Sequence, residues 1–333
     1  MSAPKVVLWR PMYDPAGAAE LEKAGARVVV VDSSAPEDVM RELEDAKALW
    51  VRTPEKVTRA VLESAPELVV VSTSGFGTDN VDLKAASELG ILVVNHPGFG
   101  RIPVAEHTIL MVLACLKQLV WSDRATRDGS AWEQRTGLEF FELEGKTVGM
   151  VGIGFIGSDV ARKLTLGFRA RVVAYDPHVD PRIPLVTGVE MAPSLDRMLE
   201  QAQILCICAE LTDETRVMIG KAQLAKLPKG AIVVNTARGQ ILDIDALQES
   251  LEAGHVRGAG LDVVYPEPLR PGHPLLARPD VVLSPHTGGL SIETSARLAR
   301  SAVEQITTAL GGNMPRYPVN GAAWSGASSR RPH

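Results

Sequence analysis

Continuous runs of apolar, mostly β-branched residues alternate with helix-like segments along almost the whole chain. A run that is apolar at every position is typical of a strand covered on both faces, as in parallel sheets with crossover helices. The segment 16–25 has a helical pattern, and Gly25 closes it at the position just after the helix end. The first part of the chain therefore predicts a parallel sheet whose strands are residues 5–9, 27–31, 48–51, 68–72 and 91–95.

A second series of strands is predicted at residues 147–152, 171–176, 204–209, 231–236, 258–264 and 281–285. An apolar-faced helix expected over 103–120 and an exposed stretch rich in charge and glycine, 122–145, separate the two series. A last helical segment, 291–310, follows the second series and can return the chain to the first domain.

This order predicts an α/β protein of two Rossmann-like or flavodoxin-like domains, each with a parallel sheet, and an inter-domain cleft. Small-molecule sites form preferentially in such clefts. We expect a discontinuous first domain of residues 1–101 plus 291–320, and a second domain of residues 102–290. The tail 321–333 is low in complexity and is predicted to be disordered.

Composition narrows the possible partners. A chain of 333 residues is long enough for two cores, and a net charge of −5 without a lysine or arginine cluster argues against nucleic-acid or membrane-surface partners. The apolar stretches are too short to span a bilayer, and the chain enters a strand at once without a signal-peptide pattern, so we expect a cytoplasmic protein. The three cysteines lie in apolar segments without zinc spacing, so no metal is predicted.

A glycine motif gives the first chemical prediction. Gly152, Gly154 and Gly157 form G-x-G-x-x-G between a predicted strand and a predicted helix, and the next strand ends in Asp176. This context suits a dinucleotide whose pyrophosphate lies at a helix N-terminus. The Asp176 carboxylate would accept hydrogen bonds from the adenosine ribose and repel a 2′-phosphate, so the predicted cofactor is NAD rather than NADP. The second domain is therefore predicted to be the NAD-binding one.

Polar residues follow the later strands of this domain, where ligands of open α/β sheets bind. Arg238 follows the strand 231–236, Glu267 lies in "GLDVVYPEP", and His286 follows the strand 281–285. Reduction of a 2-keto acid needs a bidentate grip on the carboxylate, which arginine gives, and an acid for the developing alkoxide, which histidine gives. A glutamate bonded to that histidine would fix its tautomer and favour its charged form. These three residues are therefore the predicted catalytic set.

The chain resembles the D-isomer-specific 2-hydroxyacid dehydrogenases over about residues 5–320, through "SGFGTDNVDL", "VVNHPGFGRIPVAEHT", "VGIGFIG", "NTARGQILD", "GLDVVYPEP" and "SPHTGG". The resemblance implies that Arg238 is the catalytic arginine, Glu267 the glutamate and His286 the acid/base. It implies that Asp262 holds the nicotinamide carboxamide, and that the loop of the first domain binds the substrate carboxylate through Ser74, Gly75, Phe76 and Gly77. It adds cofactor-lining roles for Phe155, Ile156, Ala209, Thr236 and Ala237, and a homodimer formed through the helix 103–120 and its flanks.

Some positions depart from the family and leave alternatives open. Arg52 matches a phosphate-binding arginine of phosphoglycerate dehydrogenases, so a short enzyme of that kind is one alternative, with a surface arginine as the other interpretation. Glu210, Phe99 and Arg101 replace residues common in the family, without a predicted role. Formate dehydrogenase is disfavoured by Glu267, because a glutamine is typical there. A different class, an NAD(H)-sensing dimeric scaffold like the family's corepressors, is weakened by the intact catalytic set.

Overall fold

The structure is a computed structural model that describes residues 3–180 and 182–326. The chain divides into two compact units, each described by itself below. Unit 1 takes the described residues up to Gly100 and those from Leu290 onward, and unit 2 is residues 101–289. The chain passes from unit 1 to unit 2 after Gly100 and returns to unit 1 after Gly289.

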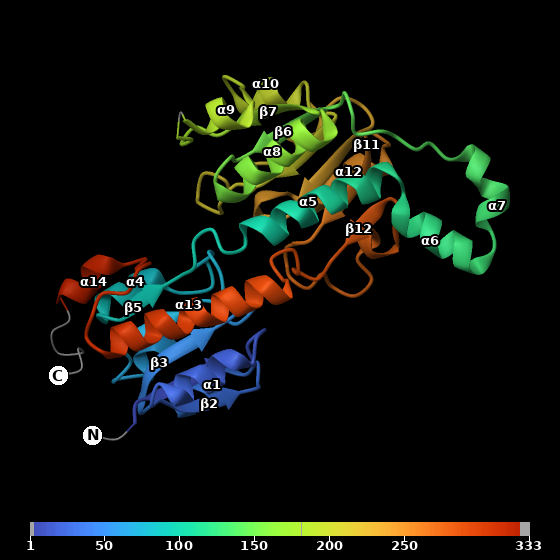
Figure 1. Cartoon of the computed structure of the whole chain (residues 1–333). Coiled ribbons are helices and arrows are strands. Elements are labelled where there is room, and N and C mark those ends of the chain that lie inside the picture. The colour runs from blue at the N-terminus through green and yellow to red at the C-terminus, as the bar shows by residue number, and fades with distance from the viewer. Residues whose placement is uncertain (1–2, 181, 327–333) are drawn as a thin grey trace. The chain divides into compact units, whose positions relative to one another are not determined.

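Unit 1 is built on a parallel sheet with the strand order β2-β1-β3-β4-β5 (Figure 1). The described strands are β1 (Lys5–Trp9), β2 (Arg27–Val31), β3 (Ala46–Val51), β4 (Val70–Ser72) and β5 (Leu92–Val94). Its helices are α1 (Ala16–Lys23), α2 (Pro36–Leu43), α3 (Arg59–Glu63), α4 (Leu83–Glu88), α13 (Ile292–Leu310) and α14 (Gly321–Gly326).

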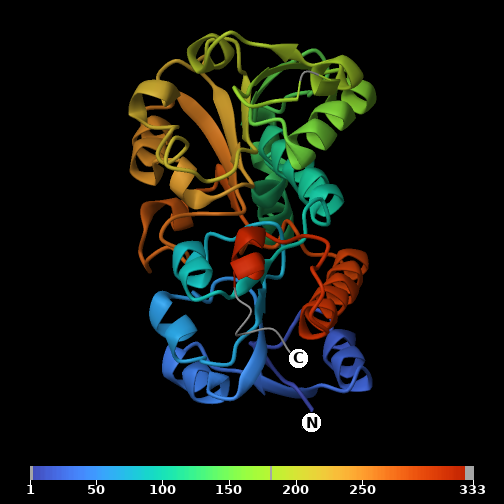
Figure 2. The same cartoon turned by 90° about the vertical axis from the view of Figure 1, so that its left-hand side faces the viewer.

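Strand β1 shows why the continuous apolar runs form this sheet. All five of its residues are buried, and successive side chains point to opposite faces. Val7 and Trp9 pack in the core beneath α2, α3 and α4, whereas Val6 and Leu8 pack in the core beneath α1 and α13. Figure 2 shows α13 beside α1 on that second face, in agreement with the contact between the two helices. The last long helix of the chain thus completes the core of unit 1.

Unit 2 is built on a larger parallel sheet with the strand order β12-β11-β10-β9-β6-β7-β8. The described strands are β6 (Thr147–Val151), β7 (Arg171–Tyr175), β8 (Glu190–Met191), β9 (Ile204–Ile207), β10 (Ala231–Asn235), β11 (Val256–Leu261) and β12 (Val281–Leu283). Its α-helices are α5 (Arg101–Leu116), α6 (Leu119–Asp128), α7 (Ala131–Gln134), α8 (Phe155–Phe168), α9 (Arg182–Thr187), α10 (Leu195–Leu199), α11 (Lys221–Leu224) and α12 (Ile244–Glu252). Short 3₁₀ helices are η1 (Arg135–Gly137), η2 (Gly239–Ile241) and η3 (Pro274–Ala277).

Two cores lie on the two faces of this sheet. Helices α5 and α8 cover one face, and α10, α11 and α12 cover the other. Helices α6 and α7 extend away from the sheet (Figure 1). Both units therefore have a parallel sheet between helix layers, and the predicted α/β class with two Rossmann-like domains is confirmed.

The structure corrects two predictions about helices. The helix expected over 103–120 is two helices, α5 and α6, separated at Gln118, whose φ of 45° is left-handed. The stretch 122–145, for which no helix was predicted, contains most of α6 together with α7 and η1. No single helix among the described residues is long and apolar enough to cross a membrane; only α5 and α6 taken together reach that length, with a bend of 58° between them.

The start of the predicted disordered tail is helix α14. Trp324 is the physical reason, since its side chain is buried in the core that also contains Leu21 and Ala299. Burying an indole offsets the entropy lost on ordering this short segment. The rest of the predicted tail, residues 327–333, lies outside the described residues.

Candidate active site

The turn between β6 and α8 carries the glycine motif. Gly152 has a left-handed φ of 85°, and its N–H donates to the carbonyl of Tyr175 at 3.0 Å. A Cβ on Gly152 would lie 2.7 Å from the backbone of Ala209, and one on Gly157 would lie 2.4 Å from the carbonyl oxygen of Gly152. Both distances are too short for any side chain, so these two glycines are needed for the turn itself.

Gly154 differs from its two neighbours in the motif. A Cβ built there meets no atom within 4 Å, so the fold does not require a glycine at this position. Gly154 also precedes the first turn of α8, which no side chain caps. Uncapped N–H groups at a helix start bind anions, and a glycine there lets a phosphate approach the backbone closely. The turn therefore fits the pyrophosphate of a dinucleotide.

Asp176 lies at the end of β7, beside this turn. One carboxylate oxygen accepts from the N–H of Ile153 at 2.9 Å, and the other from the N–H of His178 at 2.9 Å. A carboxylate has about four acceptor positions, so two remain for ribose hydroxyls. The predicted cofactor-lining residues Phe155 and Ile156 open α8, while Ala209, Thr236 and Ala237 follow the neighbouring strands β9 and β10.

Substitutions in the motif should separate cofactor binding from folding. We expect Gly154→Ala to keep the wild-type melting temperature but to raise the Kd for NADH about tenfold, because its methyl group occupies space that the phosphates need. Gly157→Ala should instead lower the melting temperature, because its Cβ clashes with the Gly152 carbonyl. Thermal unfolding and NADH fluorescence titration measure the two effects.

Gly167→Ala is the matched control, since Gly167 also lies on α8 and a Cβ there meets no atom within 4 Å. This control should bind NADH like the wild type and gain helix stability of about 0.5–1 kcal/mol. Unchanged NADH binding by Gly154→Ala would show that the phosphates do not approach this glycine.

Arg238 follows β10 in a loop folded around Asn235, the last residue of that strand. The buried Asn235 side chain donates to the carbonyl of Arg238 at 3.0 Å and accepts from the N–H of Ala237 at 3.0 Å. The half-buried Arg238 side chain donates through Nη1 to the carbonyl of Ala237 at 2.8 Å. The hydrogen bonds of Asn235 therefore fix the backbone from which the Arg238 side chain extends.

Gly239 fixes the next step of this loop. A Cβ on Gly239 would lie only 2.0 Å from the carbonyl oxygen of Val264. Because Val264 stands three residues before Glu267, this close approach brings the backbone after Arg238 against the segment that leads to Glu267. The two predicted catalytic segments are thus packed together within unit 2.

His286 and Glu267 form a hydrogen-bonded pair. Nδ1 of His286 lies 3.1 Å from Oε1 and 3.3 Å from Oε2 of Glu267. Because Nδ1 faces a carboxylate, it carries a hydrogen and leaves Nε2 for a ligand. His286 also has a left-handed φ of 54°, a conformation that costs a residue with a side chain of order 1–3 kcal/mol and that clusters at functional sites.

Asp262 holds the loop that carries His286. Its Oδ1 accepts from Ser284 Oγ at 2.5 Å and from the N–H of Thr287 at 2.9 Å, and its Oδ2 accepts from the N–H of Gly288 at 2.9 Å. Nε2 of His107 lies 3.4 Å from Oδ1. Little acceptor capacity is left for a nicotinamide carboxamide, so that predicted role stays a prediction.

The ionisation of Asp262 follows from these contacts. Burial alone would raise its pKa, but the hydrogen bonds of His107, Ser284 and the Gly288 and Thr287 N–H groups outweigh it and hold the pKa at about 2. The group is therefore a carboxylate at any working pH, and it stabilises the His286 loop through charge-assisted hydrogen bonds.

The loop of unit 1 that is predicted to bind substrate, residues 74–77, is held in place by hydrogen bonds to its carbonyl groups. The Gly75 carbonyl accepts from the N–H of His96 at 3.0 Å and from Thr73 Oγ1 at 3.0 Å, and the Phe76 carbonyl accepts from Asn95 Nδ2 at 2.7 Å. In the described part of the chain no acceptor bonds the N–H groups of Gly75, Phe76 or Gly77. A backbone with paired carbonyls and unpaired N–H groups is suited to bind an anion.

Ser74 and Arg52 stand at the base of this loop. Ser74 Oγ donates to the Val51 carbonyl at 3.1 Å and accepts from Trp50 Nε1 at 3.0 Å, so its hydroxyl is used within the fold. Arg52 donates to the Pro11 and Thr53 carbonyls, and its guanidinium lies 5.0 Å from the ring centroid of Tyr13. These contacts hold the Arg52 side chain in place, and they leave its role as a phosphate ligand a prediction.

The cysteines contribute no chemistry to this site. Burial raises the pKa of both Cys115 and Cys208 to about 12 and also raises the pKa of Cys206 well above its usual value, so the thiols are unreactive. Among residues 3–180 and 182–326 no group of histidine, cysteine and carboxylate side chains is arranged to hold a metal ion.

Several residues that position the site were not predicted. Asn235 had a signal, since it ends a β-branched run before Ala-Arg-Gly. His107 and Ser284 lie in motifs that carry the family resemblance, but no role was predicted for them, since they form their 2.8 Å hydrogen bond across 177 residues of sequence. Thr108, which bonds Thr236 at 2.7 Å, likewise lies in an apolar helix that the sequence pattern marks only as core.

Several known proteins are similar to this chain. A family model described as "D-isomer specific 2-hydroxyacid dehydrogenase, NAD binding domain" matches residues 109–288. The chain is 35% identical to a glyoxylate reductase of Thermofilum pendens, over 96% of this chain and 95% of the relative. It is 34% identical to a D-3-phosphoglycerate dehydrogenase of Methanocaldococcus jannaschii, over 95% of this chain but only 59% of that longer relative.

Solved structures agree with this comparison. An NAD-dependent formate dehydrogenase of Staphylococcus aureus, solved in complex with NAD, has a TM-score of 0.82 and 30% identity, covering 91% of this chain and 95% of that one. The predicted nicotinamide cofactor is therefore supported by both the family model and this structure. The family model, the relatives and the glycine turn together show that the chain belongs to the D-isomer-specific 2-hydroxyacid dehydrogenase family.

Proposed function

We propose that the protein is an NAD-dependent oxidoreductase that interconverts a D-2-hydroxy acid and its 2-keto acid. The observation that carries this proposal is the packing of the Arg238 loop against the segment leading to Glu267, with His286 bonded to Glu267. This packing supports a role for Arg238 in binding an anion and for His286 as an acid/base, because the two residues and Glu267 follow the adjacent strands β10, β11 and β12 at the sheet edge where ligands bind.

NADH, held by the glycine turn and Asp176, would supply the hydride that C2 of the keto acid receives. Arg238 binds the substrate carboxylate through two parallel N–H···O bonds, the geometry that a guanidinium group prefers. His286, protonated on Nε2, donates that proton to the C2 oxygen as negative charge develops on it. Glu267 stays ionised and stabilises the charged ring, and in the oxidation direction His286 takes the proton back. The D configuration is inferred from the family.

The N–H groups of Gly75, Phe76 and Gly77 are proposed as further donors to the substrate carboxylate. Asp176 is proposed to select NAD over NADP, because its carboxylate would repel a phosphate on the ribose. We further propose that the protein works in the cytoplasm.

The substrate is to be identified by NADH oxidation with glyoxylate, hydroxypyruvate, phosphohydroxypyruvate and bulkier keto acids. We expect small unphosphorylated acids to give the highest kcat/KM, because the Arg52 guanidinium is engaged by backbone carbonyls and Tyr13. Preference for the phosphorylated acid, lost in Arg52→Ala, would instead identify a short phosphoglycerate dehydrogenase. No turnover of any keto acid, with tight NADH binding, would favour an NAD(H)-sensing scaffold.

Replacing Glu267 should change the pH profile. Glu267→Gln keeps a hydrogen-bond acceptor near His286 but removes the negative charge that stabilises the protonated ring. The pH above which keto-acid reduction falls to half should therefore move down. Steady-state rates between pH 5 and 9 measure it. Glu210→Gln, an exposed carboxylate after β9, is the charge-matched control and should leave the profile in place.

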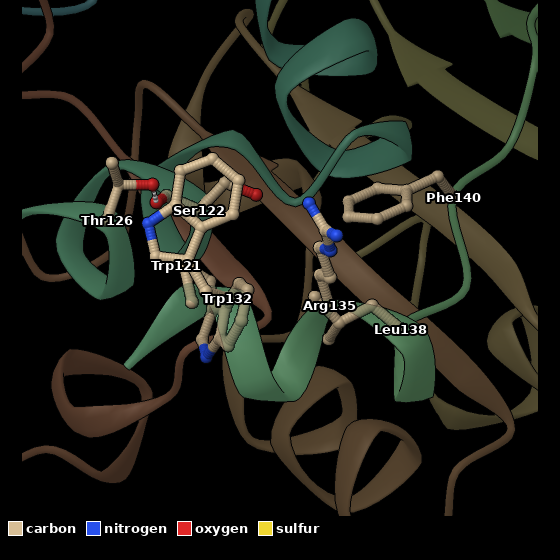
Figure 3. A pocket seen from close by; sticks show the side chains of 8 residues that line it. Trp121, Ser122, Thr126, Trp132, Arg135, Leu138 and Phe140 are labelled. Atoms are coloured by element: carbon tan, nitrogen blue, oxygen red, sulfur yellow. Dashed lines mark hydrogen bonds between the residues drawn. The ribbon is translucent and has the colours of Figure 1, made fainter. Parts of the chain in front are cut away.

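A homodimer is proposed through α6, α7 and the segment that follows. Trp121, Trp132, Arg135 and Phe140 line a pocket of about 180 Å³ there (Figure 3), and the indole of Trp132 is 67% exposed. Exposed aromatic rings with an adjacent arginine are typical of the centres of protein interfaces. Light scattering should give a mass twice that of the 35.7 kDa chain. A monomer would contradict the proposal.

A further inference from the structure

Unit 1 holds a cationic pocket that the proposed reaction does not use. This open pocket has a volume of about 290 Å³, far more than the space that one water molecule needs. Arg297, Arg300 and Glu304 come from α13, where their i, i+3, i+7 spacing places them on one helix face, and Arg316 comes from the segment after that helix. The pocket thus has an excess of two positive charges.

The three guanidinium groups are not neutralised by ion pairs. Arg297 donates to Thr294 Oγ1 at 2.6 Å, and Arg316 lies 5.1 Å from the ring centroid of Tyr317. In the described residues no carboxylate lies within 4.0 Å of any of the three groups; Glu293 acts on Arg297 only at longer range. The pocket therefore offers an anion three guanidinium groups that have no carboxylate partner within 4.0 Å in the described part of the chain.

The walls of the pocket add shape. Phe99 lies edge-on to Tyr317, with their ring centroids 6.2 Å apart, and edge-on to His96 at 5.8 Å. The pocket is therefore lined by aromatic rings as well as by guanidinium groups, and Arg316 packs against one of these rings. Three guanidinium forks suit a tetrahedral dianion, which offers acceptor oxygens in several directions.

The floor of the pocket reaches the substrate loop. Ser301 Oγ bonds Nδ1 of His96 at 2.9 Å, and Gln305 donates to the Asn95 carbonyl at 3.0 Å and accepts from the N–H of Tyr317 at 3.0 Å. His96 and Asn95 are the residues that hold the carbonyls of Gly75 and Phe76. The pocket and the loop therefore share the same two hydrogen-bonding residues.

The His96 ring is neutral in this chain of contacts. Desolvation by burial lowers its pKa to about 4, against the opposing hydrogen bond to the Thr73 carbonyl. With Nε2 facing that carbonyl at 3.0 Å, Nε2 carries the hydrogen and Nδ1 accepts from Ser301. The connection to the loop is thus a directed network of neutral groups and adds no charge to the pocket.

We propose that this pocket binds a phosphate group, free or as a monoester, through Arg297, Arg300 and Arg316, and that occupancy restrains the Gly75–Gly77 loop through Gln305, His96 and Asn95. The proposed binding of phosphate does not depend on the proposed reaction. The effect on the loop is measured by hydrogen exchange, so failure of the proposed dehydrogenase activity would not be mistaken for failure of this site.

The test is calorimetric titration of the NAD⁺-saturated protein with inorganic phosphate and with glycerol 2-phosphate, at constant ionic strength. The Arg300→Ala/Arg316→Ala double variant should raise the phosphate Kd at least about tenfold. Glu304→Gln should lower the Kd, because it removes the carboxylate of the pocket. Lys23→Ala/Lys84→Ala, which removes equal charge from α1 and α4 of the same unit, is the control and should change it less than about twofold.

Hydrogen exchange of the peptide over residues 70–80 gives the second measurement. Phosphate should slow exchange in the wild type and in the lysine control, but not in the arginine double variant. Equal phosphate affinity in the arginine and lysine double variants would overturn the site. Binding without slower exchange, or slowing that persists in the arginine variant, would overturn the restraint of the loop. Tighter binding of the monoester than of free phosphate would identify an organic phosphate as the ligand.

Discussion

His286→Ala is expected to lower kcat for keto-acid reduction by at least about 100-fold, the lower end for loss of a general acid. The Kd for NADH should stay the same, because His286 lies on the loop after β12 and not in the glycine turn. Rapid-mixing kinetics and NADH fluorescence titration measure the two quantities. His178→Ala, which removes an exposed histidine of the same unit, is the control and should keep full activity.

The backbone at position 286 calls for a second variant. Asparagine tolerates a left-handed φ better than alanine does, so His286→Asn should keep the loop while still removing the acid. Both variants should lose activity alike, although His286→Asn should unfold at the higher temperature. Wild-type turnover in His286→Asn would contradict the assignment of His286 as the acid.

Arg238→Ala is expected to lower kcat/KM about 1000-fold, because two charge-assisted hydrogen bonds of about 1.5–3 kcal/mol each are lost. Arg238→Lys should lose less, since it keeps the charge but not the planar fork. The specific measurement compares a keto acid with its methyl ester. The wild type should strongly prefer the acid, and both variants should lose most of that preference.

This comparison isolates the carboxylate contact from damage to the fold. A misfolded variant would lose activity toward acid and ester together and would keep their ratio. Arg197→Ala, an exposed arginine on α10, should keep the wild-type preference. If Arg238→Ala still prefers the acid to the same degree, the carboxylate is bound elsewhere.

Much of this fold could be predicted from the sequence because most of its strands are buried on both faces and are therefore apolar at nearly every position. The strands of both sheets were predicted except β8, whose two exposed residues, Glu190 and Met191, give no apolar signal. The break between α5 and α6 was also missed. It depends on the left-handed backbone of Gln118, and a glutamine in the sequence does not predict the end of a helix.

The site was predictable to the extent that its residues follow strands in sequence order. Glu267 and His286 could be named from their positions, and the structure pairs them. The network around Asp262 could not be predicted, because its partners come from α5 and from the loop after β12 and only the fold brings them together.

A Cβ on Gly239 would lie only 2.0 Å from the Val264 carbonyl oxygen, and this close approach limits the design of variants that accept new substrates. Any larger residue at position 239 would push the loop of Arg238 away from the segment that leads to Glu267. It would thereby disturb both the proposed carboxylate ligand and the proposed acid/base pair. A randomised library should therefore yield almost no working variants at position 239 or at Asn235. Changed selectivity for the substrate side chain should instead be sought at Phe76, which is exposed and whose side chain is not part of these contacts.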